Sequence, residues 1–222
     1  MWAKYLFLFL ISTSLYAKYP DKWWRPVAQS ELASWEIGPQ GGTKDVSVIL
    51  SKRNELGILS NFAKTPFVLD GKRYPGVEGF WQSLKFPEND KDIRTNFTNW
   101  KYSRSEVGQM SGFEAKAAGD YATTIMRKNK IDWVTFKGRR LKYWTDKKGE
   151  HYKLILRAMQ AKLEQNPEVK EILMSTKDLI LLPDHKTKPT DPPAWKYNKI
   201  WMKLRKNLQI KENSEASMSD QA

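Results

Sequence analysis

The sequence contains no cysteine and only two histidines, His151 and His185. Without cysteine there is no disulfide framework, no thiolate metal site and no cysteine nucleophile. Two histidines are too few for a histidine-rich metal site, and neither a zinc-protease motif nor a phosphate-binding P-loop is present. The sequence therefore points away from metal chemistry.

Acidic residues are also scarce relative to basic ones, with 25 Asp and Glu against 38 Lys and Arg and a net charge of +13. This excess attracts anions such as phosphates, nucleic acid or an anionic membrane surface. The basic residues occur in short clusters at residues 127–130, 137–142 and 147–148. Such clusters form either an ordinary solvated surface or a phosphate-lined cleft, and both interpretations stay open.

The apolar run near the start, residues 5–16, is too short to cross a bilayer, which needs roughly 20 residues. Lys4 precedes this run, and Ala17 and a charged stretch follow it. That layout is typical of a secretory signal peptide. We expect residues 1–17 to be removed and the protein to be exported to the periplasm or secreted. An uncleaved anchor or a buried helix is the alternative.

The length and a hydrophobic content of 40% suit one domain with a substantial core. Residues 18–44 are rich in Pro, Gly and Trp and are expected to form an irregular lead-in. Residues 45–210 are expected to form the domain, and the polar residues 211–222 a disordered tail. We predict an α+β fold: a single compact domain, mostly helical, with a small β-sheet.

Apolar residues at helical spacing predict helices over residues 77–86, 111–128, 151–165, 167–176 and 195–208. Gly119 is expected to weaken the second of these helices. Short apolar runs predict strands over residues 46–50, 67–69, 73–74 and 179–182. Asp70-Gly71 predicts a tight hairpin turn between the second and third strands, because such turns need positive φ.

Three polar residues of the first predicted helix, Glu78, Gln82 and Lys85, recur at positions i, i+4 and i+7. Side chains at this spacing share one face of a helix. On a surface helix such a stripe is usually solvated. The alternative is a catalytic strip that combines a carboxylate, an amide and an amine.

The sequence around these three residues resembles that of the NADAR family, also called YbiA-like. The matching motifs are Ser-Asn-Phe at 60–62, Asp-Gly-Lys at 70–72, Tyr-Pro at 74–75 and Glu-x-x-x-Gln-x-x-Lys-Phe at 78–86. Further similarity occurs at residues 113–116, 156–176 and 200–205, in the order of the family. The resemblance covers about residues 46–208.

This resemblance implies hydrolysis of an N-glycosidic bond in an ADP-ribose-like or ribosylamine substrate, such as ADP-ribosyl-guanine, with no cofactor. The partner is then a small or nucleic-acid-linked ribosyl substrate. One alternative is a ribosylamine N-glycosidase of riboflavin synthesis, which fits poorly with a leader. Another is a non-catalytic module that binds ADP-ribose, NAD or nucleic acid.

The resemblance also assigns roles. Glu78 matches the family glutamate, which stabilises the positive anomeric carbon and activates water. Lys85 is the first candidate for a Schiff-base amine and Lys72 the second. The expected contacts to the ribose hydroxyls and the base are Asn61, Phe62, Trp81 and Gln82, although Trp81 suits the core equally well.

The chain departs from the family pattern in two places. Gly79 stands where the family often has a large side chain. The glycine-rich C-terminal segment of the family is replaced by a Pro-rich one. Its polar and aromatic residues either rebuild that wall of the site or belong to a stiff loop with a core Trp. These residues are Asp184, His185, Asp191 and Trp195.

Overall fold

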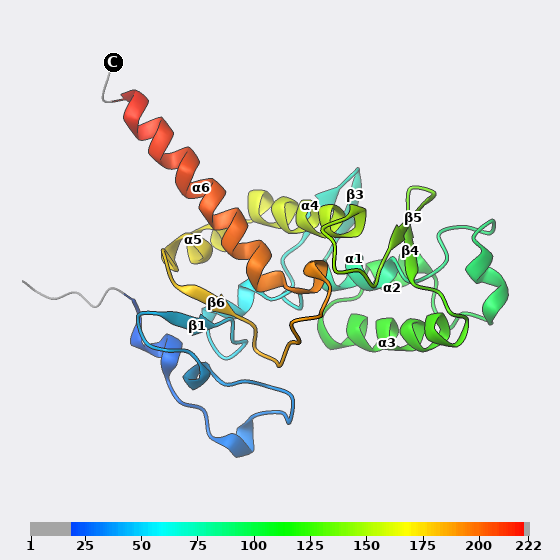
Figure 1. The fold of residues 1–222 in the computed structure, drawn as a ribbon, viewed down its shortest axis with the longest axis horizontal. Coiled ribbons are helices and arrows are strands. Elements are labelled where there is room, and N and C mark those ends of the chain that lie inside the picture. The colour runs from blue at the N-terminus through cyan, green and yellow to red at the C-terminus, as the bar shows by residue number, and fades with distance from the viewer. Residues whose placement is uncertain (1–18, 220–222) are drawn as a thin grey trace, which may run out of the picture.

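The computed structural model describes residues 19–219, so the predicted leader lies outside the described residues. Helices dominate the structure, and strands are short (Figure 1). The helices are α1 (Val77–Ser83), α2 (Arg104–Gly108), α3 (Gly112–Lys128), α4 (Glu150–Gln165), α5 (Pro167–Ser175) and α6 (Tyr197–Ser219). The strands are β1 (Ser47–Ile49), β2 (Phe67–Leu69), β3 (Lys72–Tyr74), β4 (Trp133–Phe136), β5 (Arg139–Lys142) and β6 (Ile180–Leu182). The predicted single α+β domain is confirmed.

The strands form three two-stranded sheets instead of one small sheet. β1 and β6 pair in parallel, with Val48 opposite Leu181, and so join the two ends of the domain. β2 and β3 form the predicted hairpin, in which Asp70 has φ 50° and Gly71 has φ 79°. Both positive φ values are those that a tight two-residue turn requires.

A second hairpin, β4–β5, was not predicted. Its turn has the same geometry, with Lys137 at φ 51° and Gly138 at φ 73°. Val134 and Leu141 face the core, whereas the basic residues between them are exposed. The basic cluster at residues 137–142 is therefore the outer face of a hairpin.

The main core surrounds α4, whose predicted apolar face is buried at Tyr152, Ile155, Met159 and Leu163. α4 contacts α1, α5, α6 and the hairpins. A smaller cluster packs between α1, α2 and α3 and includes Phe86, Val107, Ala118 and Ala122. α1 lies between the two clusters, and every one of its residues is buried.

Two glycines allow helices to approach α1 closely. A Cβ on Gly79 would lie 2.1 Å from the carbonyl oxygen of Met110, so a larger side chain does not fit here. A Cβ on Gly119 would lie 1.7 Å from Gln82 Oε1. α3 continues unbroken through Gly119, where a weak point was predicted, and this glycine makes room for a side chain of α1.

The lead-in is irregular, as predicted, but it packs against the domain. It contains short 3₁₀ turns, and Trp23 and Trp24 are buried. The indole of Trp24 donates a hydrogen bond to the carbonyl of Ser47 in β1 (2.8 Å), and that of Trp23 to Glu55 (2.7 Å). The lead-in therefore belongs to the folded body.

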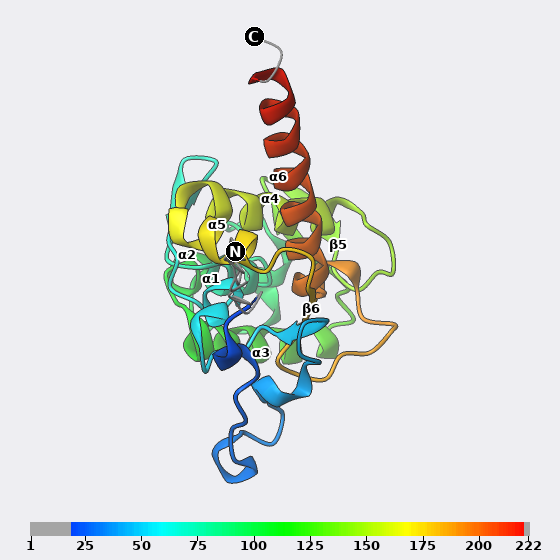
Figure 2. The same ribbon diagram turned by 90° about the vertical axis from the view of Figure 1, so that its left-hand side faces the viewer.

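The last helix differs from its prediction at both ends. A 3₁₀ turn over Pro193–Trp195 precedes it, and α6 continues to Ser219, through much of the stretch predicted to be disordered. Its final part projects from the body (Figures 1 and 2). Two ion pairs support this part: Lys170 with Glu212 (3.4 Å) and Lys211 with Glu215 (3.8 Å). The composition of the segment does not reveal them. Within the described residues, no helix is long and apolar enough to cross a membrane.

Candidate active site

A cleft of about 760 Å³ opens beside α1 and α3, a size typical of small-molecule sites. The lead-in and the segments before β2, after β5 and after β6 complete its wall. Lys72 and Asp191 do not line this cleft: Lys72 lies on the exposed hairpin and Asp191 in a surface loop. The other predicted residues do line it, namely Asn61, Phe62, Glu78, Trp81, Gln82, Lys85, Asp184, His185 and Trp195.

Glu78 occupies the first turn of α1 and is only 5% exposed. Its backbone N–H donates to the carbonyl of Asn61 (3.0 Å), and its Oε1 accepts a hydrogen bond from Gln82 Nε2 (2.7 Å). Burial raises the pKa of Glu78, while Gln82 and Lys85 oppose this rise. The carboxyl is thus held in one orientation with an elevated pKa, as suits a general acid or base.

Lys85 follows the end of α1, because the helix stops at Ser83 and not at residue 86. A tight turn, closed by the bond from the Lys85 N–H to the Gln82 carbonyl (3.2 Å), directs its side chain toward α3. There the amine donates to Thr123 Oγ1 (2.8 Å) and to the Gly119 carbonyl (3.2 Å). Burial lowers the pKa of Lys85 to about 8, although Glu78 opposes this fall.

Trp81 is both a core and a cleft residue. It is 6% exposed, and its indole donates to the hydroxyl of Tyr143 (3.2 Å). Behind these two rings lies His151, which is 1% exposed. Burial, with a smaller effect of Lys85, lowers the pKa of His151 to about 3. His151 is therefore a neutral core residue.

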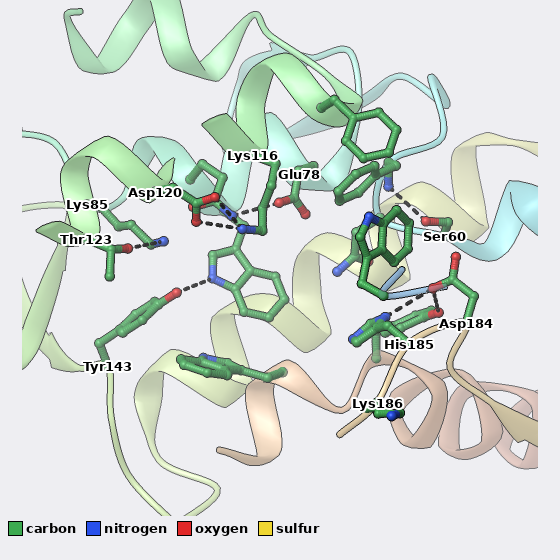
Figure 3. A pocket seen from close by; sticks show the side chains of 18 of the residues that line it. Ser60, Glu78, Lys85, Lys116, Asp120, Thr123, Tyr143, Asp184, His185 and Lys186 are labelled. Carbon is green, nitrogen blue, oxygen red and sulfur yellow. Dashed lines mark hydrogen bonds and ion pairs between the residues drawn. The ribbon is translucent and has the colours of Figure 1, made fainter. Parts of the chain in front are cut away.

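Asp184 forms the opposite end of the cleft from Lys85, with Glu78 between them (Figure 3). Its buried carboxylate accepts hydrogen bonds from Lys52 and Tyr197 and contacts His185 Nδ1 (3.0 Å). Burial opposes ionisation, but His185 and Lys52 hold the pKa of Asp184 below its usual range. The Pro-rich segment thus does supply a wall of the cleft.

Several residues that line the cleft were not predicted from the sequence. Lys116 and Asp120 form an ion pair on the rim, one turn apart on α3 (Figure 3). Phe113, Thr123 and Arg127 lie on the same face of α3 as this pair, so their helical spacing could have indicated them. The rest come from segments that are distant in the sequence, so no motif connects them. They include Trp35, Lys52, Tyr143, Trp144, Lys186 and Tyr197.

The cleft offers two buried carboxyl groups, those of Glu78 and Asp184, and the buried amine of Lys85, with amide, indole and aromatic groups around them. Across residues 19–219, no group of three or more His, Asp or Glu side chains is placed to hold a metal ion. The chemistry available from these side chains is proton transfer, stabilisation of positive charge and nucleophilic attack by an amine.

Comparison with known proteins gives two matches. Residues 54–190 match a family described as bacteriophage protein GP30.3. The NMR structure of the E. coli protein YbiA, after which the predicted family is also named, is similar at 21% sequence identity. The similarity covers 77% of this chain and 89% of YbiA, with a TM-score of 0.46. No curated protein matches the chain.

Proposed function

The chain belongs to the family described as bacteriophage protein GP30.3, and we propose that it is an N-glycoside hydrolase. Its substrate is an ADP-ribose-like or ribosylamine compound, free or linked to nucleic acid. One observation carries the proposal: the Glu78 carboxyl and the Lys85 amine are both buried in the wall of one cleft. Two buried ionisable groups in a single concave site are typical of catalysis.

In the proposed reaction the bond between the anomeric carbon and the base nitrogen breaks. The Glu78 carboxylate stabilises the positive charge that develops on this carbon, and it removes a proton from the attacking water. The water oxygen bonds to the carbon, and the leaving nitrogen takes up a proton. Gln82 holds the carboxylate in place through its hydrogen bond to Oε1.

A covalent route uses Lys85. When the sugar ring opens, the anomeric carbon becomes the carbon of a C=N bond to the base nitrogen. The neutral Lys85 amine attacks this carbon, and the base nitrogen takes up a proton and leaves. Water then hydrolyses the resulting Schiff base, which frees the Lys85 amine and the sugar aldehyde. The lowered pKa of Lys85 supports this route, because an amine with a pKa of about 8 is partly neutral near physiological pH. Thr123 and Gly119 fix the direction of the amine.

The proposal is tested by incubating the protein with ADP-ribosylated guanine oligonucleotide, NAD and a ribosylamine phosphate, followed by mass spectrometry. We expect release of a free base or amine together with the sugar product from at least one of these compounds. Glu78→Gln is the matched inactive control. Tight binding of all three compounds without any product would instead support a binding module.

A further inference from the structure

Three aromatic side chains gather at one end of the cleft, away from Lys85. Trp35 is 42% exposed and Phe113 is 62% exposed, and their ring centroids lie 6.1 Å apart. Phe62 meets Phe113 edge to face, with centroids 5.1 Å apart. All three line the cleft. Large aromatic faces left open to water beside a site are characteristic of ligand binding.

Trp35 comes from the lead-in, outside the segment that matches the GP30.3 family. Its loop is nevertheless firmly attached to the domain. The guanidinium of Arg53 donates to both carboxylate oxygens of Glu36 (2.9 and 2.7 Å) and to the carbonyl of Glu31 (2.6 Å). The N–H of Ile37 donates to the Asp184 carbonyl (2.7 Å). The indole is therefore held at the cleft by the segments on both sides of it.

Lys52 connects this aromatic cluster with the polar wall. Its amine lies 5.3 Å from the Trp35 ring centroid and 5.0 Å from that of Phe62, and it pairs with the Asp184 carboxylate. The cluster thus offers flat apolar faces and a positioned hydrogen-bond donor. A planar heterocycle with acceptor atoms on its edge fits both features.

We propose that Trp35, Phe62 and Phe113 bind the base of a nucleotide, and that Trp35 determines specificity for it. Lys52 donates to an acceptor atom on the edge of the base. Lys116 and Lys186, which also line the cleft, suit the phosphates of the same ligand. The ribose of this ligand then extends toward Glu78 and Lys85. This placement of the ribose is the one part of the inference that rests on the proposed function.

The test is isothermal titration calorimetry of the protein with AMP, ADP-ribose and ribose 5-phosphate. Trp35→Ala is expected to weaken binding of AMP and ADP-ribose about tenfold or more, the usual effect of losing one stacking ring. Its affinity for ribose 5-phosphate, which has no base, should stay unchanged. Trp35→Phe keeps a flat ring and should retain most of the affinity. Ile93→Ala, at an exposed apolar residue outside the cleft, is the control.

Equal affinity of wild type and Trp35→Ala for AMP would overturn the inference, as would an equal loss for ribose 5-phosphate. Failure of the wild type to bind AMP or ADP-ribose at millimolar concentration would overturn it too. Circular dichroism confirms that each variant is folded. Base-dependent binding through Trp35, without hydrolysis of any N-glycoside, would refute the proposed function and leave this inference standing.

Discussion

Burial shifts the pKa values of Glu78 and Lys85 in opposite directions, and each residue opposes the shift of the other. The pKa of the carboxyl rises and that of the amine falls, so both move toward the physiological range. Proton transfer is fastest when the pKa of the catalytic group lies near the working pH. At the residue scale, the chemistry of the cleft therefore depends on keeping these two groups away from water.

Glu78→Gln should reduce kcat about 10²–10⁴-fold, since that is the usual contribution of a positioned acid or base. The change preserves shape and removes the charge. In the wild type, activity that needs the carboxylate should be lost as pH falls through the raised pKa of Glu78. The acid limb of the kcat profile should therefore lie above the usual glutamate value. Steady-state kinetics measure both effects, and unchanged turnover in Glu78→Gln would exclude this residue from the mechanism.

Lys85 and Lys72, the two candidate amines, should behave differently. Lys85→Arg keeps the charge but removes the nucleophile, so we expect a folded variant that binds ligand without turnover if a Schiff base forms. Lys72→Ala should remain active, because Lys72 lies on the hairpin outside the cleft. Borohydride trapping with substrate gives an independent measure. An active Lys85→Arg variant without a trapped adduct would leave water attack directed by Glu78.

Lys162 of α4 is a buried amine that the reaction does not use. It donates to the carbonyls of Ile58 (2.6 Å) and Ser60 (2.9 Å), and burial lowers its pKa to about 7. Between about pH 7 and the unfolded value of 10.5, the unfolded chain binds more protons, so stability rises with pH. Below pH 7 both states are protonated, and the full cost of burying the charge is present.

We therefore compare the free energy of unfolding of the wild type with that of Lys162→Met from pH 6 to pH 9 by urea titration. Above pH 7 the free energy of unfolding of the wild type should rise relative to that of the variant, by up to about 1.4 kcal/mol per pH unit. Below pH 7 the difference should be constant. A difference that is flat over the whole range would show that Lys162 keeps its proton in the fold.

At the scale of elements, α1 is a fully buried helix that carries Glu78 and Gln82, and Lys85 lies two residues after its end. It touches α2, α3 and α4, so its position depends on how closely these helices approach. Gly79 sets that approach on the α2 side, where the Met110 carbonyl occupies the space of a side chain.

Gly79→Ala should lower the free energy of unfolding by about 1–3 kcal/mol or more, because a backbone carbonyl cannot move aside as a side chain can. A displaced α1 would also misplace Glu78, so kcat should fall with stability. Gly149→Ala is the matched control, because nothing lies within 4 Å of a Cβ there. Urea unfolding and kinetics of both variants check this. Wild-type stability in Gly79→Ala would show that α1 can shift at no cost.

At the scale of the whole molecule, the family segment does not close the cleft alone. The lead-in brings Trp35 to one end, and Tyr197 comes from the start of α6. The parallel pair β1–β6 ties these two ends of the domain together. Removal of either flank should therefore affect the site as well as the fold.

We also propose that the leader, residues 1–17, is removed during export, leaving Lys18 as the first residue. Intact-mass spectrometry of protein from the periplasm or medium measures this. Leu8→Arg places a charge in the apolar run and should keep the protein inside the cell with its full mass. Recovery of wild-type protein from the cytoplasm with Met1 in place would contradict the proposal.

The sequence alone determined the features that depend on neighbouring residues. Helical spacing located α4, the Asp70-Gly71 pair located the first hairpin, and the stripe on α1 indicated Glu78 and Gln82. Each of these patterns acts over one or two turns, where propensity and side-chain direction decide the structure. The hairpin β4–β5 was not predicted, because its outward-facing residues are mostly basic and resemble a solvated cluster.

Only the tertiary structure decided which distant residues meet. It placed Trp35, Lys52 and Asp184 together and left Lys72 and Asp191 outside the cleft. It also explains why position 79 is a glycine, since a neighbouring backbone carbonyl occupies the space of a side chain. The pKa shifts of Glu78 and Lys85 also belong to this level, since burial causes them. Exclusion of water and contacts between remote segments depend on how the whole chain packs. The sequence therefore indicated which groups could react, and the packing of the whole chain determined their surroundings.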